Sequence, residues 1–89
     1  MPESRVAVEV VNDSGLHARP CHAFVRTAMK YEADLRVGCG DLAVNGKSIL
    51  ELMTLAAGRG DRLELVAAGP DAGALVEALE RLVAEGFEE

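Results

Sequence analysis

The sequence is poor in aromatic residues, in cysteine and in positive charge, and each scarcity excludes a class of protein. Aromatic residues make up 3% of the 89 residues, so leucine, valine and alanine must fill the core that an apolar content of 49% supports. Nine Lys and Arg residues against fifteen Asp and Glu give a net charge of −6. This charge argues against a nucleic-acid binder, which usually presents a basic face. No apolar run approaches the roughly 18 residues of a membrane-spanning helix, so we expect no membrane insertion.

The two cysteines, Cys21 and Cys39, form neither a disulfide framework nor a CxxC motif. One bridge between them is compatible with the count, but we expect reduced thiols in an intracellular protein. The first residues lack the basic segment and apolar stretch of a secretory signal. The sequence therefore predicts a cytoplasmic chain, long enough for one domain and too short for two.

Two local patterns place the first elements. Apolar residues alternate over Arg5–Val11, which predicts a strand that ends at the turn-forming residues 12–15. From Ala18 the apolar spacing becomes helical. Pro20 fixes the start of this helix, because proline fits only the first turn, where its missing N–H would have had no partner.

The remaining patterns predict a β-α-β-β-α-β-α order. We expect a hairpin of strands at 34–38 and 42–44, a helix at 47–57 capped by Gly58, a strand at 62–68, a helix from 69–71 to Gly86, and a short tail at 87–89. Each strand is apolar mainly on one face. This pattern favours an α+β fold in which an antiparallel sheet carries helices on one face and solvent on the other. Several folds share this core, and spacing alone does not choose among them.

His17 lies immediately before the helix that Pro20 begins. The first N–H groups of a helix lack backbone partners, and the helix dipole adds partial positive charge there, so this position suits an anion. Arg19 adds a guanidinium that matches phosphate oxygens. A neutral imidazole is also a competent nucleophile. A lone histidine before a helix is more often just a polar residue near the cap, so this local pattern leaves both interpretations open.

Two motifs together indicate a family. Residues 13–20, DSGLHARP, resemble the active-site signature of the HPr family, the histidine-containing phosphocarrier proteins of the phosphoenolpyruvate-dependent sugar phosphotransferase system. Residues 45–50, NGKSIL, resemble the family's regulatory serine segment at the expected distance. The likeness covers essentially the whole chain. It implies one phosphocarrier domain over residues 1–89 with an open-faced β-sandwich fold, in which three helices cover one face of a four-stranded antiparallel sheet.

The resemblance also implies a reaction. His17 would accept a phosphoryl group on Nδ1 from phosphorylated enzyme I and pass it to a histidine of an enzyme IIA, while Arg19 steadies the phosphate. The chain would then be a carrier with a transient phosphohistidine rather than an enzyme in the strict sense. We expect it to act as a monomer without a cofactor or metal.

Ser48 begins the helix predicted after the second motif. A hydroxyl commonly caps a helix, and capping alone explains a serine there. The resemblance implies that Ser48 is also the target of an HPr kinase/phosphorylase, and a phosphate is electrostatically well placed at a helix start. This leaves an alternative function, a purely regulatory HPr-like module in carbon or nitrogen control that binds the kinase or a transcriptional regulator.

The helix after Ser48 is apolar nearly all round, although a helix on an open-faced sheet buries only one stripe. We predict burial for Leu52, Leu55 and Ala56. The other apolar residues are predicted to form an exposed patch near His17 on which partners dock: Ile49, Leu50 and Met53. The alternative is that all six residues belong to the core.

Three residues near the motifs depart from the family or suggest other chemistry. Cys21 is four residues after His17, so oxidation of its thiol could block phosphoryl transfer. A metal or redox protein using His17, Cys21 and His22 is a distant alternative, because no nearby residue completes a ligand set. Gly46 replaces what is often a larger apolar residue, and we predict that it loosens the approach to Ser48.

Overall fold

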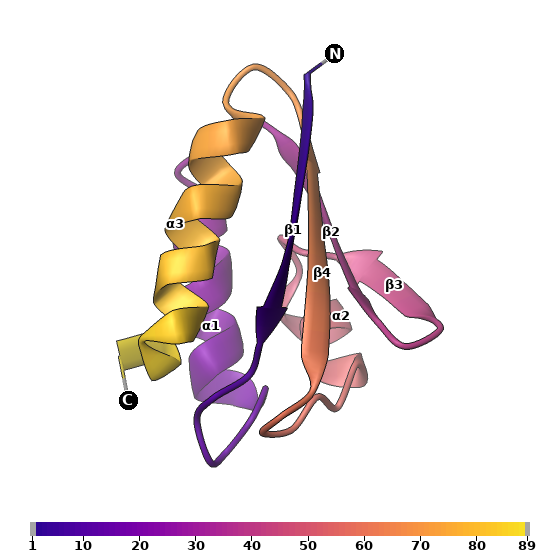
Figure 1. Cartoon of the computed structure of the whole chain (residues 1–89), viewed down its shortest axis with the longest axis vertical. Coiled ribbons are helices and arrows are strands. Elements are labelled where there is room, and N and C mark those ends of the chain that lie inside the picture. Colours follow the sequence, from indigo (N-terminus) through magenta and orange to yellow (C-terminus); the bar gives the residue numbers. More distant parts are fainter. Residues whose placement is uncertain (1, 89) are drawn as a thin grey trace.

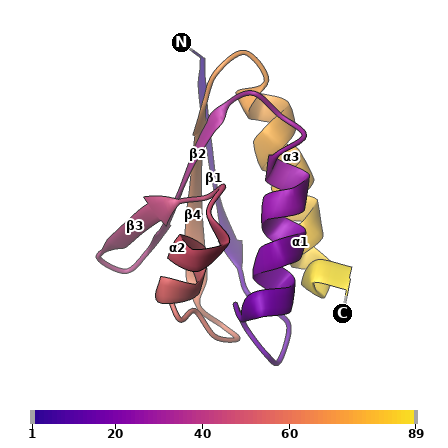
Figure 2. The same ribbon diagram turned by 180° about the vertical axis from the view of Figure 1, so that it is seen from behind.

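Three helices cover one face of a four-stranded sheet in the computed structural model, which describes residues 2–88 (Figures 1 and 2). The strands are β1 (Glu3–Glu9), β2 (Asp34–Cys39), β3 (Leu42–Asn45) and β4 (Arg62–Ala68). The helices are α1 (Ala18–Ala28), α2 (Ile49–Thr54) and α3 (Ala72–Ala84), and a short 3₁₀ helix, η1, spans Gly86–Glu88. The predicted α+β class and element order are confirmed.

The strand order in the sheet is β1-β4-β2-β3, and all neighbours are antiparallel. Leu65 in the centre of β4 pairs with Val6 on one side and Val37 on the other. The hairpin of β2 and β3 is confirmed. Since β1 and β3 are the edge strands, the last strand to appear in the sequence, β4, lies in the interior of the sheet and joins its two halves.

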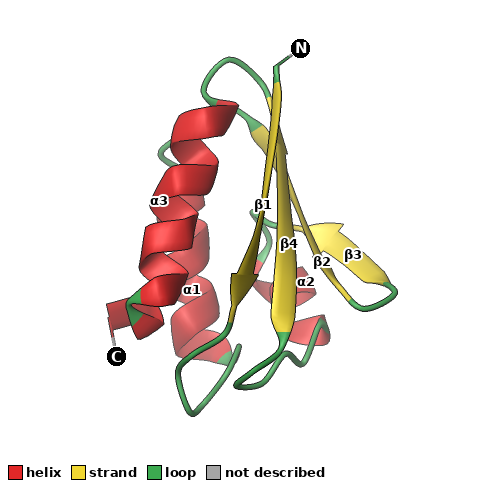
Figure 3. Ribbon diagram, in the orientation of Figure 1, coloured by secondary structure: helices red, strands yellow, loops and turns green. Residues whose placement is uncertain are grey.

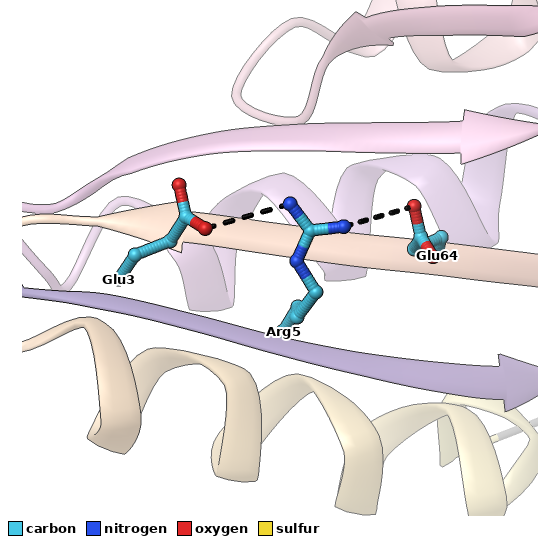
Figure 4. Close-up of polar contacts among 3 residues, drawn as sticks. All are labelled: Glu3, Arg5 and Glu64. Atoms are coloured by element: carbon cyan, nitrogen blue, oxygen red, sulfur yellow. Dashed lines mark hydrogen bonds and ion pairs between the residues drawn. The ribbon is translucent and has the colours of Figure 1, made fainter.

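Alternation along the strands separates a buried face from an exposed one. Leu63, Leu65 and Ala67 of β4 are buried, whereas Arg62 and Glu64 are exposed to solvent. On the exposed face, Arg5 forms an ion pair with Glu3 of its own strand and another with Glu64 of the neighbouring strand β4 (Figure 4). The sequence pattern therefore places the helices on one side only, as predicted.

The helices supply the second layer of the core. α3 buries an apolar stripe that includes Leu75, Leu79, Leu82 and Val83. α1 buries Pro20, Cys21, Phe24 and Ala28. The core is almost entirely aliphatic, as the scarcity of aromatic residues requires. Within residues 2–88, no helix combines the length and apolar character needed to cross a membrane.

The predicted tail at 87–89 is partly wrong. Phe87 is only 4% exposed and belongs to the core, in the turn of η1 that brings the end of the chain back beside α1. Gly86 ends α3 as predicted, and its φ of +69° lets the chain reverse. The end of the helix at Gly86 gives no local sign that the aromatic residue after it folds back into the core. Glu89 lies outside the described residues.

α2 is shorter than the predicted 47–57. Residues 45–48 form a turn in which the Lys47 N–H donates to Asn45 Oδ1 (2.9 Å), so the helix begins only at Ile49. It ends at Thr54, and the residue that takes a left-handed conformation is Ala56, with a φ of +50°. The prediction that Gly58 caps this helix is therefore wrong.

Gly46 does not loosen its surroundings, which corrects a further prediction. A Cβ on this residue would lie 2.4 Å from Leu35 Cδ2 and 3.0 Å from Val37 Cγ2. Its N–H donates to Leu35 O at 2.8 Å. Gly46 therefore packs tightly against β2, because Leu35 fills the space that a larger residue would occupy.

Two pairs of loops close the ends of the molecule (Figure 3). The loop from β1 to α1 and the loop from α2 to β4 lie at one end. The loop from α1 to β2 and the loop from β4 to α3 lie at the other. His17 belongs to the first end, hereafter the site end, and the opposite one is the far end.

Candidate functional site

His17 is the N-cap residue of α1, so the helix begins where Pro20 predicts. Its backbone is extended (φ −107°, ψ −168°), and its carbonyl accepts the first helical hydrogen bond, from the Cys21 N–H at 3.0 Å. The imidazole is exposed and does not cap the helix. The N–H groups of Ala18 and Arg19 have no acceptor within the helix, and Pro20 has no N–H. The position thus combines an accessible imidazole with the positive end of a helix dipole.

The loop before His17 is held by backbone contacts. Gly15 takes a left-handed conformation (φ +65°), and the next residue, Leu16, donates its N–H to Ala57 O at 2.8 Å. A Cβ on Gly15 would lie 2.5 Å from the same oxygen, so no larger residue fits. These contacts fasten the chain that leads into His17 to the segment that follows α2.

Asn12 also shapes this loop, and the sequence interpretation missed it as a site residue. It is 9% exposed, and its side-chain Nδ2 donates to Gly15 O at 3.0 Å. Its backbone carbonyl accepts the Gly15 N–H at 3.2 Å. Asn12 was counted only as one of four turn-forming residues. Its neighbours in sequence are exposed, so the local pattern gives no signal that this asparagine turns inward.

Arg19 is exposed in the first turn of α1, two residues after His17. It lies in a shallow groove lined by Ala18, Arg19, His22, Ala23, Arg26 and Phe87. Arg19, His22 and Arg26 recur at helical spacing, so they give this side of α1 a basic character although the whole chain is acidic. His22 also lines this groove. Arg26 was not singled out in the sequence.

Ser48 is the N-cap of α2, and its Oγ accepts the Glu51 N–H at 3.2 Å, as the capping interpretation predicts. The turn before it is firmly placed, because Lys47 Nζ donates to Tyr31 O at 2.7 Å. Glu51 in turn accepts the Asn45 N–H at 3.0 Å. Ser48 itself is half-buried. A phosphate on this hydroxyl would replace one cap with a more highly charged one.

The predicted docking patch is only partly exposed. Leu50 is 78% exposed and Met53 is 40% exposed, both unusually high for large apolar side chains. Ile49, predicted to be exposed, is half-buried and packs against the core. Leu52 and Leu55 are buried as predicted. Ala56 is exposed, so its predicted burial is wrong: α2 ends before it, and the left-handed turn directs it outward.

Cys21 lies in the core with no exposed surface, while His17 and His22 are exposed. Burial raises the pKa of the Cys21 thiol to about 11. A buried, protonated thiol is a poor target for oxidation, which contradicts the redox hypothesis. Among the residues that the structure describes, no three His, Cys, Asp or Glu side chains gather as a metal site would require.

A contact that sequence reasoning missed joins the two loops of the site end. Arg59 Nη1 lies 2.7 Å from Asp13 Oδ1, and the two residues are 46 positions apart in the sequence. Neither residue belongs to a patterned element, so no periodicity could have paired them. Their loops are brought together only by the folded sheet.

Comparison with known proteins gives consistent matches. A family model described as the phosphorylation site of the PTS HPr component matches residues 5–85. The phosphocarrier protein HPr of Treponema pallidum is 43% identical over 82 residues, which cover 92% of this chain and 93% of that protein. The HPr structure from Thermoanaerobacter tengcongensis has a TM-score of 0.92 and 37% identity, covering 97% of each chain. The structure of Crh, the Bacillus subtilis catabolite repression protein, has a TM-score of 0.76 and 38% identity, covering 89% of this chain and 91% of that one.

Proposed function

Because the chain belongs to the HPr family of phosphocarrier components, we propose that it carries a phosphoryl group on His17 from enzyme I to an enzyme IIA of the sugar phosphotransferase system. The observation that carries the proposal is the placement of an exposed imidazole at the start of α1, where it leaves the helix N–H groups uncapped. Family membership alone does not assign partners. The geometry supports the role because a group in transit must be reached by two proteins in turn.

In the first transfer, a lone pair of His17 Nδ1 forms a bond to phosphorus while the bond between phosphorus and the donor enzyme I breaks. The second transfer reverses the roles, and His17 becomes the leaving group when a histidine of enzyme IIA attacks. Neither step consumes a cofactor. The helix N-terminus and the Arg19 guanidinium stabilise the phosphoryl oxygens in both steps. In this proposal the protein acts as a cytoplasmic monomer and forms no catalytic product of its own.

Exposed apolar side chains beside the site support brief docking. Leu50 and Met53 present apolar surface on α2, which packs against α1. Ile49 contributes the edge of its half-buried side chain. A small patch with a flexible methionine can adapt to several partners, which a carrier between two proteins requires.

The test is phosphorylation by phosphoenolpyruvate and enzyme I. We expect one acid-labile phosphate on the chain, loss of all label in His17→Ala, and transfer of the label to enzyme IIA. His22→Ala is the matched control, since His22 is the second of the two histidines and is also exposed on α1. It should keep its label. A chain that takes up no acid-labile phosphate, or keeps it after His17→Ala, would contradict the proposal.

A regulatory role through Ser48 is a second candidate, favoured by the likeness to Crh and by the position of the hydroxyl at a helix start. Here a kinase such as HPr kinase/phosphorylase would attach an acid-stable phosphate, and a transcriptional regulator would bind the product. Acid-stable label that disappears in Ser48→Ala, together with no transfer to any enzyme IIA, would favour this role over the first.

A further inference from the structure

The loop before His17 and the loop after α2 meet at the site end through an ion pair. Arg59 Nη1 lies 2.7 Å from Asp13 Oδ1, and the side chains are 69% and 89% exposed. Exposed pairs of this kind contribute little to global stability, because solvent screens the charges and two long side chains must be ordered. Any effect of this pair is therefore local, on the two loops that it joins.

The same two loops are in backbone contact directly beside the reacting residue. Leu16 donates its N–H to Ala57 O, and a Cβ on Gly15 would lie 2.5 Å from Ala57 O and 2.9 Å from Gly58 Cα, so the two backbones approach closely there. Leu16 immediately precedes His17, and Arg59 follows Gly58. These backbone contacts form a short junction between the two loops, and the ion pair lies on the solvent-exposed side of this junction.

We propose that Arg59 is a positioning residue: its ion pair with Asp13 holds the loop before His17 against the segment after α2, and so fixes the backbone from which the imidazole reaches the phosphoryl group. The inference rests on the proposed transfer function. Positioning of a nucleophile is sensitive to small displacements, so a contact that is weak in stability can still change a rate.

Arg5 provides a matched control on the same molecule. It also forms exposed ion pairs, with Glu3 at 3.4 Å and with Glu64 at 3.7 Å, and it is 58% exposed (Figure 4). These contacts lie on the exposed face of the sheet, the first within β1 and the second between β1 and β4. Arg5→Gln removes the same charge and the same kind of contact as Arg59→Gln, but at a place that does not bear on the loop before His17.

Two measurements test the proposal in the full-length protein. Amide hydrogen exchange at Leu16 reports the junction without any phosphoryl donor. The rate of phosphorylation by enzyme I, measured against carrier concentration, separates kcat from KM. For Arg59→Gln we expect exchange at Leu16 to rise and kcat to fall, each by about threefold, with KM unchanged. Arg5→Gln should match the wild type in both. Arg59→Lys, which keeps a charge that can reach Asp13, should stay close to the wild type.

A charge swap distinguishes positioning from a direct effect of the Arg59 charge. The double variant Asp13→Arg with Arg59→Asp restores the ion pair with its signs exchanged, so it should recover both slow exchange and kcat. The proposal would be overturned if the swap recovered neither slow exchange nor kcat. It would also be overturned if Arg59→Gln raised KM and left kcat unchanged, because Arg59 would then act on the phosphate or on the partner. Wild-type exchange and kcat in Arg59→Gln would also overturn it. A wild-type protein that accepts no phosphate would instead contradict the proposed function, while Leu16 exchange would still decide whether the ion pair holds the junction.

Discussion

The far end and the site end are both closed by a pair of loops, but the contacts differ in kind. At the far end, the carboxylate of Asp71 accepts two backbone N–H groups at 2.8 Å, those of Glu32 and Ala33. At the site end, the corresponding loops are joined by backbone hydrogen bonds alone, one from Leu16 to Ala57 and two between Val10 and residues 60 and 61, with an exposed ion pair outside them. The far end therefore uses a charge-assisted clamp, whereas the site end leaves its helix start available to a ligand.

Each end also contains a glycine that no other residue can replace without strain. Gly69 has a φ of +148°, and a Cβ there would lie 2.7 Å from Ala33 Cα. Gly15 has a φ of +65°, and a Cβ there would lie 2.5 Å from Ala57 O. The site end has in addition the left-handed Ala56. A close backbone approach thus excludes larger residues at both ends, but only the site end supports the exposed His17. Mutations at the two ends can therefore separate effects on stability from effects on phosphoryl transfer.

The largest effect is expected from adding a methyl group to these glycines. Gly15→Ala and Gly69→Ala should each lower the free energy of unfolding by about 3 kcal/mol, because each combines a positive φ with a backbone clash. Among folded molecules, Gly15→Ala should slow phosphorylation of His17 by about tenfold, and Gly69→Ala should leave it unchanged. Urea unfolding and single-turnover phosphorylation by enzyme I measure the two quantities.

Gly40→Ala is the control for the cost of the positive φ alone. Gly40 has a φ of +60° in the hairpin turn, and a Cβ there meets nothing within 4 Å. We expect Gly40→Ala to lower the free energy of unfolding by about 1 kcal/mol and to leave phosphorylation of His17 unchanged. If Gly69→Ala slowed transfer as much as Gly15→Ala, the distinction between the two ends would fail.

The sequence pattern predicted an element correctly where neighbouring residues determine its position. The range of β4, Arg62–Ala68, follows from strict alternation, and the start of α1 follows from the rule that admits Pro20 only in a first turn. Strand β1 was predicted two residues too late, because Val10 and Val11 continue the apolar pattern. The structure ends β1 at Glu9, and Val10 instead exchanges hydrogen bonds with Gly60 and Asp61 in the opposite loop.

The contacts that build the site end could not be predicted in the same way. Nothing in a run of Leu-Ala-Ala-Gly indicates that Ala56 rather than Gly58 takes the left-handed conformation, since that choice depends on where Ala57 O must meet Leu16. The role of Asp71 depends on residues 38 and 39 positions away. Resemblance to the family singled out His17 as the candidate phosphoryl acceptor, but only the folded chain shows which contacts hold its backbone.

At the far end, loss of the Asp71 carboxylate is expected to have a smaller effect on stability. The Glu32 N–H that donates to its carboxylate lowers the pKa of Asp71 below the usual 3.8, and Ala33 adds to this. A depressed pKa means that the carboxylate stabilises the fold above pH 3.8 and that this contribution is lost as the pH falls through the folded pKa. Asp71→Asn should therefore be less stable than the wild type at neutral pH, and the difference should shrink on acidification.

Urea midpoints at about pH 6 and about pH 2.5 measure this difference. Asp41→Asn, in the exposed hairpin turn, controls for the loss of one negative charge. Both variants should transfer phosphate normally while folded. A stability difference for Asp71→Asn that stayed constant with pH would show that the two backbone hydrogen bonds do not depend on the ionised carboxylate.

The smallest effect is expected at the left-handed residue of the site end. An alanine with a φ of +50° costs about 1–2 kcal/mol relative to a right-handed conformation, and glycine avoids this cost. Glycine also gives the unfolded chain more freedom, which offsets about 0.4–1 kcal/mol of the gain. Ala56→Gly should therefore raise the free energy of unfolding by about 0.5 kcal/mol without faster transfer, as measured by urea unfolding and phosphorylation. The same substitution at exposed Ala74 inside α3 should instead lower it by about 1 kcal/mol, because glycine is a poor helix former. If Ala56→Gly were as destabilising as Ala74→Gly, residue 56 would hold no backbone strain. The two ends would then differ only in the contacts that join their loops.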